Sequence, residues 1–331
     1  MFIINESRIT NHESRIVTTF ASPPQPRRMA VETFIPAYLE MDPDELVARA
    51  DELGRLASPC TLCPRECGSY RKDGEKGYCR TGYLPVVSSI HAHHGEERPL
   101  SGTQGSGTIF LTNCNLGCTF CQNYDISHMG RGQVVPVQDL AMSMVNLQRA
   151  GCHNINFVTP SHQLHAIVAA VSLAAIDGLR LPLVYNTGGY DCIESLKLLD
   201  GIFDIYMPDL KFTNPSTSEA LAEARDYPNV VVKAISEMYR QVGDLSTDES
   251  GIARRGLLVR HLVLPGGLAG SDEAFRFLAE EISVNTYLNI MAQYRPSYDA
   301  IGQPVIGEGL QQADYLDALE MARKWGLERL D

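Results

Sequence analysis

The chain has 331 residues, of which 44% are hydrophobic and 21% are charged, proportions that exclude a chain disordered throughout. With 28 Lys and Arg against 40 Asp and Glu, its net charge is −12, which argues against broad binding to a nucleic acid backbone. We find no apolar stretch long enough to cross a membrane and no secretory signal, so we expect a cytoplasmic protein without membrane partners. There, nine reduced cysteines are better candidates for metal ligands than for disulfides.

The N-terminal third is predicted to hold a tail, a helix and a cysteine-rich segment. Asp42 is expected to cap the helix, with Pro43 in its first position and Pro59 after its end. The tail is rich in proline and polar residues, which predicts disorder. The predicted divisions of the chain are a disordered tail at 1–35, a cysteine-rich module at 36–95, a core domain at 96–300 and a C-terminal helix at 301–331.

Beyond residue 107, short β-rich runs alternate with helical patterns. The predicted strands are Thr108–Thr112, Asn154–Thr159, Leu181–Asn186, Phe203–Met207, Val230–Ala234, Leu257–Leu264 and Tyr287–Ala292. The helical patterns lie at 137–149, 162–177, 191–200, 215–225, 272–282 and 309–325. This alternation predicts an α/β fold in which βαβ units build a parallel sheet, closed or partly closed into a barrel. In such barrels the chemistry lies at the C-terminal ends of the strands.

Three cysteines, Cys114, Cys118 and Cys121, follow the first predicted barrel strand with the spacing C-x3-C-x2-C. Three thiolates from one short loop can each bind one iron of a cubane cluster. The loop has no fourth cysteine, so one iron would keep an open position for another ligand. Two alternatives, buried structural cysteines and a zinc site, fit this spacing less well.

The loop, with Phe120 before the last cysteine, resembles the cluster motif of the radical S-adenosylmethionine (SAM) superfamily. The segments 95–97, 99–102, 107–110 and 121–123 resemble its pyruvate formate-lyase activating enzyme-like branch. The resemblance implies a partial (β/α)6 TIM-like barrel, with a [4Fe-4S] cluster on the three cysteines and SAM on the fourth iron. It also implies an oxidoreductase that cleaves SAM reductively to a 5′-deoxyadenosyl radical for hydrogen abstraction. A flavodoxin or ferredoxin would donate the electron.

For the substrate, the resemblance implies a glycyl radical enzyme or another protein, as in [formate-C-acetyltransferase]-activating enzymes. One alternative is radical SAM modification of a small molecule, a cofactor or RNA, because the chain lacks the inserted two-cluster ferredoxin domain of many glycyl radical activases. A second alternative is a non-catalytic, metal-stabilised binding protein. The sequence assigns no catalytic residue.

The resemblance also implies SAM contacts at the strand ends. Lys211 would offer its ammonium to the SAM carboxylate, and Arg260 resembles an arginine near SAM. Activating enzymes carry Gly-Gly-Glu where this chain has Val158–His162, and an aspartate where it has Asn186. For Lys211 the alternative is a solvated lysine at a strand end, and for Arg260 it is an ion pair at the rim of the pocket. Ser161 can instead cap the next helix. The candidate cofactor-binding residues are Phe120, Thr159, His162, Asn186, Thr187, Asp209, Lys211 and Arg260.

Four further cysteines, Cys60, Cys63, Cys67 and Cys79, form a second candidate metal set. Four soft ligands suit a closed zinc site or a second iron–sulfur cluster. The segment has few large apolar residues, so a metal would have to supply folding energy. The third alternative is no metal, with redox-active thiols. His91 and His93 alternate along a predicted strand, which favours a strand lining the barrel or the cysteine module over metal ligation.

Overall fold

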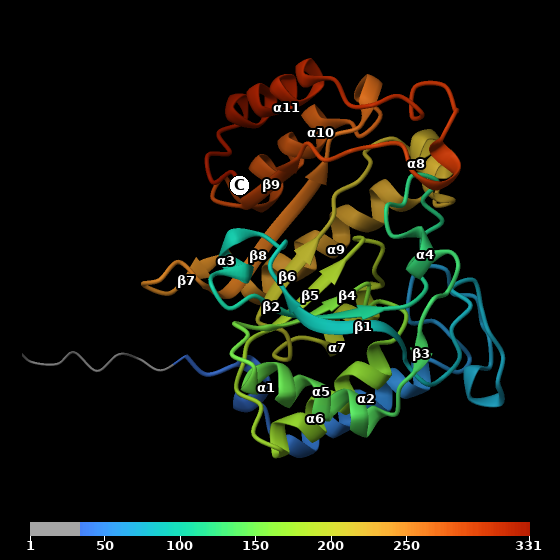
Figure 1. The fold of residues 1–331 in the computed structure, drawn as a ribbon, viewed down its shortest axis with the longest axis vertical. Helices are drawn as coiled ribbons and strands as arrows, with labels where there is room; N and C mark the ends of the chain where they lie inside the picture. The colour runs from blue at the N-terminus through green and yellow to red at the C-terminus, as the bar shows by residue number, and fades with distance from the viewer. Residues whose placement is uncertain (1–33) are drawn as a thin grey trace, which may run out of the picture. The chain divides into compact units, whose positions relative to one another are not determined.

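Six parallel strands form the centre of the fold in the computed structural model, which describes residues 34–331 (Figure 1). Across the sheet they are β2 (Ser106–Leu111), β4 (Ile155–Val158), β5 (Leu183–Thr187), β6 (Ile205–Pro208), β8 (Ala253–Leu262) and β9 (Tyr287–Met291). The predicted partial (β/α)6 barrel is therefore confirmed. The predicted tail at 1–35 lies outside the described residues except for its last two positions.

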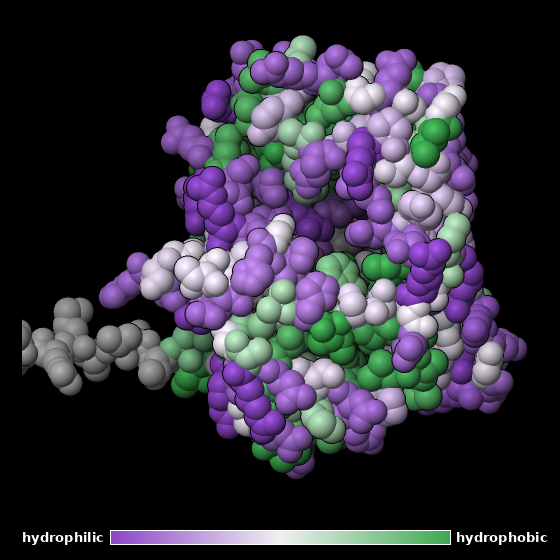
Figure 2. Space-filling view, in the orientation of Figure 1, coloured by the Kyte–Doolittle hydropathy of each residue, from purple (hydrophilic) through white to green (hydrophobic). Residues whose placement is uncertain are grey.

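Antiparallel strands extend the sheet at its edges. They are β1 (Val86–His93), which pairs with β2, β3 (Gln133–Val134), which pairs with β1, and β7 (Ser246–Thr247), which pairs with β8. Among the described residues no strand pairing joins β3 or β1 to β9, so the barrel is open between them. Figure 2 shows a hollow with mainly hydrophilic walls on this face.

Helices cover the outer face of the sheet because alternate strand residues are apolar on that side. Outward-facing Ile109, Ile155 and Phe157 belong to the main hydrophobic core. The described residues form the helices α1 (Ala37–Glu40), α2 (Pro43–Leu56), α3 (Arg98–Ser101), α4 (Tyr124–Ser127), α5 (Val137–Arg149), α6 (Leu164–Ile176), α7 (Ile193–Leu198), α8 (Pro215–Ala222), α9 (Tyr227–Val242), α10 (Ser271–Phe277) and α11 (Gln312–Lys324), of which α3 packs into the barrel interior instead. As predicted, Asp42 caps α2, accepting the Asp44 N–H at 2.8 Å.

Inside the barrel, a second apolar cluster fills the end remote from the cysteine loop. Its members come from α3, the strands and the loop before β7: Leu100, Val184, Ile205, Met207, Leu245, Ala253 and Leu258. The alternation continues toward the other end with Asn186 and Arg260, which lie on the same face of their strands as Val184 and Leu258. The barrel interior is therefore apolar at one end and polar at the end where the strands finish.

The predicted strand Val230–Ala234 is wrong, because these residues lie within α9. The run Val230–Val232 is β-branched, which favours a strand locally. However, the buried residues of this segment recur at helical spacing, as in Val231, Ala234, Ile235 and Met238. Burial of this apolar stripe against the sheet outweighs the small propensity penalty of three valines.

The cysteine module has little regular structure between α2 and β1. One 3-10 turn, Arg71–Asp73, interrupts it, and backbone hydrogen bonds join Cys60 N–H to Ser69 O and Gly68 N–H to Cys60 O. Residues Phe34–Asp331 form one compact unit, and the boundaries expected at 95 and 300 stay predictions. No helix between residues 34 and 331 is long and apolar enough to cross a bilayer.

Candidate functional site

The loop that carries Cys114, Cys118 and Cys121 begins where β2 ends. Its backbone is held by the end of α8, because Gly117 N–H donates to Ala222 O at 3.1 Å and Thr119 N–H donates to Leu221 O at 2.9 Å. The last carbonyls of a helix lack partners within the helix. The C-terminal end of α8 thus supplies free acceptors that fix the cysteine loop over the barrel.

The three thiols of the loop line one cavity. Burial raises the pKa of Cys114 to about 11 and raises that of Cys118 further. Such thiols keep their protons unless a metal ion or cluster takes their place. The Leu116 N–H already points at the Cys114 sulfur, at 3.4 Å, and Ser127 Oγ lies 3.1 Å from the Cys121 sulfur.

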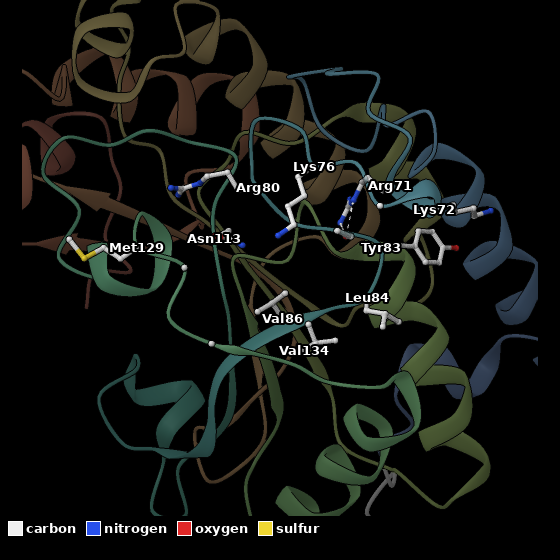
Figure 3. A pocket seen from close by; sticks show the side chains of 14 residues that line it. Arg71, Lys72, Lys76, Arg80, Tyr83, Leu84, Val86, Asn113, Met129 and Val134 are labelled. Atoms are coloured by element: carbon white, nitrogen blue, oxygen red, sulfur yellow. Dashed lines mark hydrogen bonds between the residues drawn. The ribbon is translucent and has the colours of Figure 1, made fainter.

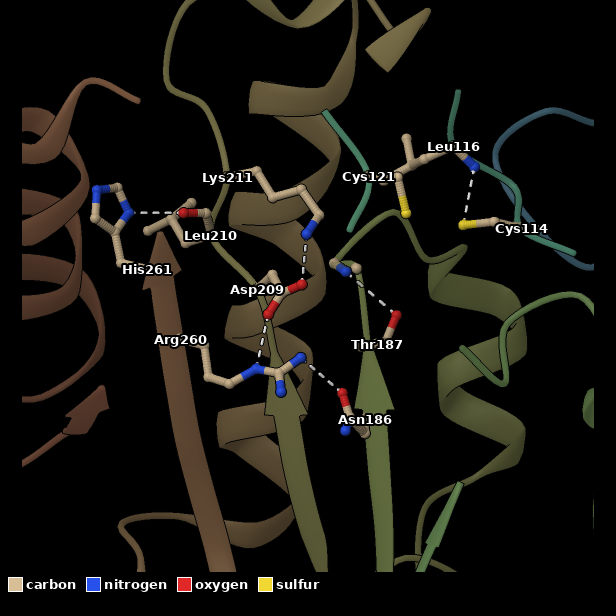
Figure 4. Close-up of polar contacts among 12 residues, drawn as sticks. Cys114, Leu116, Cys121, Asn186, Thr187, Asp209, Leu210, Lys211, Arg260 and His261 are labelled. Carbon is tan, nitrogen blue, oxygen red and sulfur yellow. Dashed lines mark hydrogen bonds and ion pairs between the residues drawn. The ribbon is translucent and has the colours of Figure 1, made fainter. Parts of the chain in front are cut away.

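Charged side chains from two strand ends face the thiols across this cavity (Figure 4). The Asp209 carboxylate, after β6, contacts Lys211 Nζ at 2.5 Å and Arg260 Nε of β8 at 2.8 Å. Arg260 also donates to Asn186 Oδ1 of β5 at 2.8 Å. Burial by itself would raise the pKa of Asp209, but the Arg260 and Lys211 charges hold it below its usual value. The site thus contains two cations and one ionised carboxylate.

Thr159 ends β4 in a strained backbone conformation. Its φ is 61°, in the left-handed region that a β-branched residue rarely adopts. The conformation is held by the Thr159 N–H, which donates to Asn186 O at 2.8 Å. A glycine would adopt this φ without strain. Thr159 lines the cavity.

The structure brings most of the predicted site residues together. Lining the thiol cavity besides the three cysteines are Thr159, Asn186, Thr187, Asp209, Lys211 and Arg260. Phe120 and His162 do not line it. Phe120 is buried against Phe212 and Tyr294, and His162 is buried with its Nε2 at 2.9 Å from Thr112 O.

Sequence reasoning missed two residues of the site. Asn113 precedes Cys114, has a φ of 70° and lines the thiol cavity. Glu96 lies before α3, and its Oε2 is 3.8 Å from Arg260. Burial raises the pKa of Glu96 to about 7, although the Arg260 charge opposes this. A single left-handed residue such as Asn113 gives no periodic signal in the sequence, and Glu96 lies before α3 rather than at the end of a barrel strand.

Beside the site, His261 is buried as a neutral ring in β8. Its Nδ1 lies 2.7 Å from Leu210 O and its Nε2 lies 3.0 Å from Ser271 Oγ. Burial lowers the pKa of His261 from 6.5 to about 4. In the unfolded chain this ring is protonated below about pH 6.5, so acid favours the unfolded state until the folded pKa is reached.

We therefore expect His261→Gln, whose amide can keep both hydrogen bonds, to be less acid-sensitive than the wild type. Between pH 7 and pH 5 the wild type should lose about 2 kcal/mol more unfolding free energy than the variant, since the protonation of one unfolded histidine drives the difference. Urea unfolding at both pH values measures it. Equal losses in the two proteins would contradict this assignment.

The module that carries the four N-terminal cysteines lies beside the cysteine loop, because Arg65 Nε donates to Asn115 O at 2.9 Å. Cys60, Cys63 and Cys79 are buried and Cys67 is exposed. The buried guanidinium of Arg71 lies 3.9 Å from the Cys60 sulfur, and burial raises the pKa of Cys63 to about 12. In residues 34–331 no three Cys, His, Asp or Glu side chains share a position for one metal ion, so the four thiols would have to move to bind zinc.

His91 and His93 lie on one face of β1, as predicted. They are opposite Thr108 and Ser106 of β2, on the face that lines the barrel. The His91 ring stacks on Phe110 with centroids 5.5 Å apart, and the burial of His93 lowers its pKa. Both histidine rings are therefore part of the barrel wall near its open side.

The thiol cavity fits an iron–sulfur cluster better than a single ion. A cubane places each cysteine on a different iron, so three thiols need no common position, and the loop supplies no fourth cysteine. Lys211 lines the same cavity as the three thiols, and its ammonium suits a ligand that carries a carboxylate. The donor set therefore fits a [4Fe-4S] cluster with a carboxylate-bearing ligand on its open corner.

Comparison with known proteins agrees with this class of site. Residues 108–252, less than half of the chain, match the family model of the Radical SAM superfamily. An uncharacterized protein of Methanocaldococcus jannaschii is 29% identical over 293 residues, covering 86% of this chain and 80% of that protein. These matches do not distinguish the pyruvate formate-lyase activating enzyme-like branch from the rest of the superfamily.

Solved structures with a similar arrangement include three proteins. A radical SAM methyltransferase from Sphaerobacter thermophilus has a TM-score of 0.46 and 16% identity, covering 68% of this chain and 65% of its own. Streptococcus suis SuiB, bound to precursor peptide SuiA, has a TM-score of 0.46 and 13% identity, covering 65% and 44%. HydG, a maturase of the [FeFe]-hydrogenase, has a TM-score of 0.48 and 12% identity, covering 88% and 64%. The chain spans less than two thirds of each of these structures.

Proposed function

We propose that the protein cleaves SAM reductively and uses the resulting radical to abstract hydrogen from a protein substrate, as activating enzymes of glycyl radical enzymes do. The cluster, when bound, supplies the electron that breaks the sulfonium bond of SAM and yields a 5′-deoxyadenosyl radical. The supporting observation is the cavity that joins three thiols, one buried and two partly buried, to two cations at the strand ends.

In this proposal the chain's own residues bind and orient the cofactors. Cys114, Cys118 and Cys121 hold the cluster, and Lys211 attracts the SAM carboxylate. Asp209 keeps Lys211 and Arg260 charged and aimed before SAM arrives, which lowers the reorganisation that binding requires. The side chains of Asp209, Lys211 and Arg260 are less than one fifth exposed, which limits the water around the reacting groups.

The open side of the barrel supports a polypeptide substrate. Because β1 and β9 are not joined, an extended segment can enter from the side rather than through a narrow mouth. The inner wall offers hydrogen-bonding groups, including Glu97 Oε2 and the Asn156 amide, and these buried atoms have no partner among the described residues. A small molecule, a cofactor or RNA is the alternative substrate class.

The test of the proposed function is anaerobic reconstitution with iron and sulfide, followed by dithionite and SAM. We expect 5′-deoxyadenosine and methionine in equal amounts, because homolysis of one sulfonium bond gives both fragments. An EPR-detectable glycyl radical on an added partner enzyme would support the protein substrate, whereas a modified metabolite would support the alternative. A protein that carries a full cluster and forms no 5′-deoxyadenosine would contradict the proposal.

For the second cysteine set we propose a structural zinc ion. The support is the nature of the four soft ligands and the shortage of large apolar residues around them. A second iron–sulfur cluster and metal-free redox thiols are the alternatives. Chemical analysis of zinc, iron and labile sulfide in a variant that lacks Cys114, Cys118 and Cys121 separates the three.

A further inference from the structure

A basic cleft lies beside the cysteine loop, between the cysteine module and the edge of the sheet (Figure 3). Its volume is about 620 Å³ and its cations are Arg71, Lys72, Lys76 and Arg80. No acidic side chain lines it among the residues that the structure describes. The positive charge of this cleft contrasts with the net charge of −12 of the whole chain. The cleft will therefore attract anionic partners that the rest of the surface repels.

Two of the four cations are available to a partner. Arg71 is 1% exposed and donates to Gly82 O and His162 O, so it shapes the floor. Arg80 donates to Ser127 O at 2.8 Å. Lys72 and Lys76 are exposed, and they give the cleft its free positive charge.

The rim of the cleft is apolar and exposed. Leu84 is 50% exposed, Met129 59% and Val134 58%, and all three line the cleft. Large apolar side chains at such exposure, grouped around cations, are typical of a protein interaction surface rather than of a site for a small anion.

Few covalent bonds separate the lining of the basic cleft from the thiols. Asn113 lines both the basic cleft and the thiol cavity, and it is bonded directly to Cys114. A second connection runs from Arg80 through Ser127, whose hydroxyl lies 3.1 Å from the Cys121 sulfur. A group docked in the cleft is therefore separated from the cluster loop by a single residue.

We propose that this cleft is the docking surface for an acidic one-electron carrier protein. The proposal rests on the proposed function, since only a reductive reaction needs an electron at these thiols. In the transfer the carrier loses one electron and the thiolate-bound cluster gains it, and no bond forms or breaks. Lys72 and Lys76 steer the carrier, Leu84, Met129 and Val134 contact it, and Asn113 leads to Cys114.

The test uses reconstituted full-length protein and a purified bacterial flavodoxin as the probe. The variant is Lys72→Glu with Lys76→Glu. We expect its Kd for oxidised flavodoxin, measured by titration calorimetry, to rise at least about tenfold at low salt, because attraction becomes repulsion. The salt dependence of binding should flatten, and cluster reduction by reduced flavodoxin should slow by a similar factor.

The matched control is Lys197→Glu with Lys233→Glu, on α7 and α9. It makes the same change in net charge with two lysines that are exposed and lie outside both cavities. We expect flavodoxin binding in this control within about twofold of wild type. An equal loss of binding in both double variants, or no loss in the cleft variant, would overturn the docking surface.

Two further measurements, flavodoxin binding by a rim variant and cluster reduction by dithionite, separate docking from other effects. Met129→Glu places one acidic group on the rim without touching the lysines, and it should also weaken flavodoxin binding. Reduction by dithionite, which needs no docking, should be unchanged in all variants. If wild type forms no 5′-deoxyadenosine with dithionite, the proposed function fails, whereas the binding measurements still decide the docking surface.

Discussion

Replacing Asp209 by asparagine should lower the unfolding free energy of the cofactor-free protein by about 3–5 kcal/mol. The carboxylate lies between Lys211 Nζ and Arg260 Nε, at 2.5 Å and 2.8 Å, in a group whose side chains are less than one fifth exposed. Without it, two cations would face each other in a site with little water. Urea unfolding at pH 7 measures the change.

Asp248→Asn is the matched control for this variant. It removes a carboxylate that pairs with Arg254 at 2.7 Å, but these side chains are 29% and 31% exposed. Water screens such a pair, and we expect a loss of less than about 1 kcal/mol. If Asp209→Asn costs no more than the control, the central role given to Asp209 in holding Lys211 and Arg260 is wrong.

Replacing Cys114, Cys118 and Cys121 together by alanine should reduce 5′-deoxyadenosine formation to the uncatalysed background. No other group of the cavity offers a soft ligand for iron among the described residues. Cys192→Ala is the control, because that thiol donates to Glu194 at 2.8 Å and lies outside the cavity. The control should keep the cluster absorbance and the activity.

The same triple variant identifies the metal at the N-terminal cysteines. We expect it to retain about one zinc per chain and no labile sulfide, as a four-thiolate structural site would. Retained sulfide would mean a second iron–sulfur cluster instead. A variant free of both zinc and iron would leave redox thiols as the remaining alternative.

Much of the site follows from local sequence and from one topological rule. The spacing of Cys114, Cys118 and Cys121 fixes a loop without reference to the rest of the chain. Asn186, Asp209 and Arg260 are far apart in sequence, yet they meet because parallel strands end at one edge of a sheet. Strand alternation likewise put His91 and His93 on one face.

The remaining features depend on tertiary packing. Phe120 and His162 lie within motifs of the site but point into the core, since side-chain direction in a loop follows no fixed period. The valines of Val230–Val232 favour a strand locally, and only the apolar stripe that α9 buries decides for a helix. The basic cleft joins segments 71–86, 113 and 129–134, which no single motif connects.

Arg65 of the cysteine module connects two loops at the end of the barrel where the strands finish. Its guanidinium donates to Asn115 O at 2.9 Å and to Glu223 O at 2.5 Å, and Tyr78 of the same module donates to Glu223 Oε2 at 2.7 Å. Removing residues 57–85 would therefore loosen two connections of the barrel together, the one that follows β2 and the one that follows β6. The segment 57–85 is therefore part of the wall that holds the cysteine loop in place.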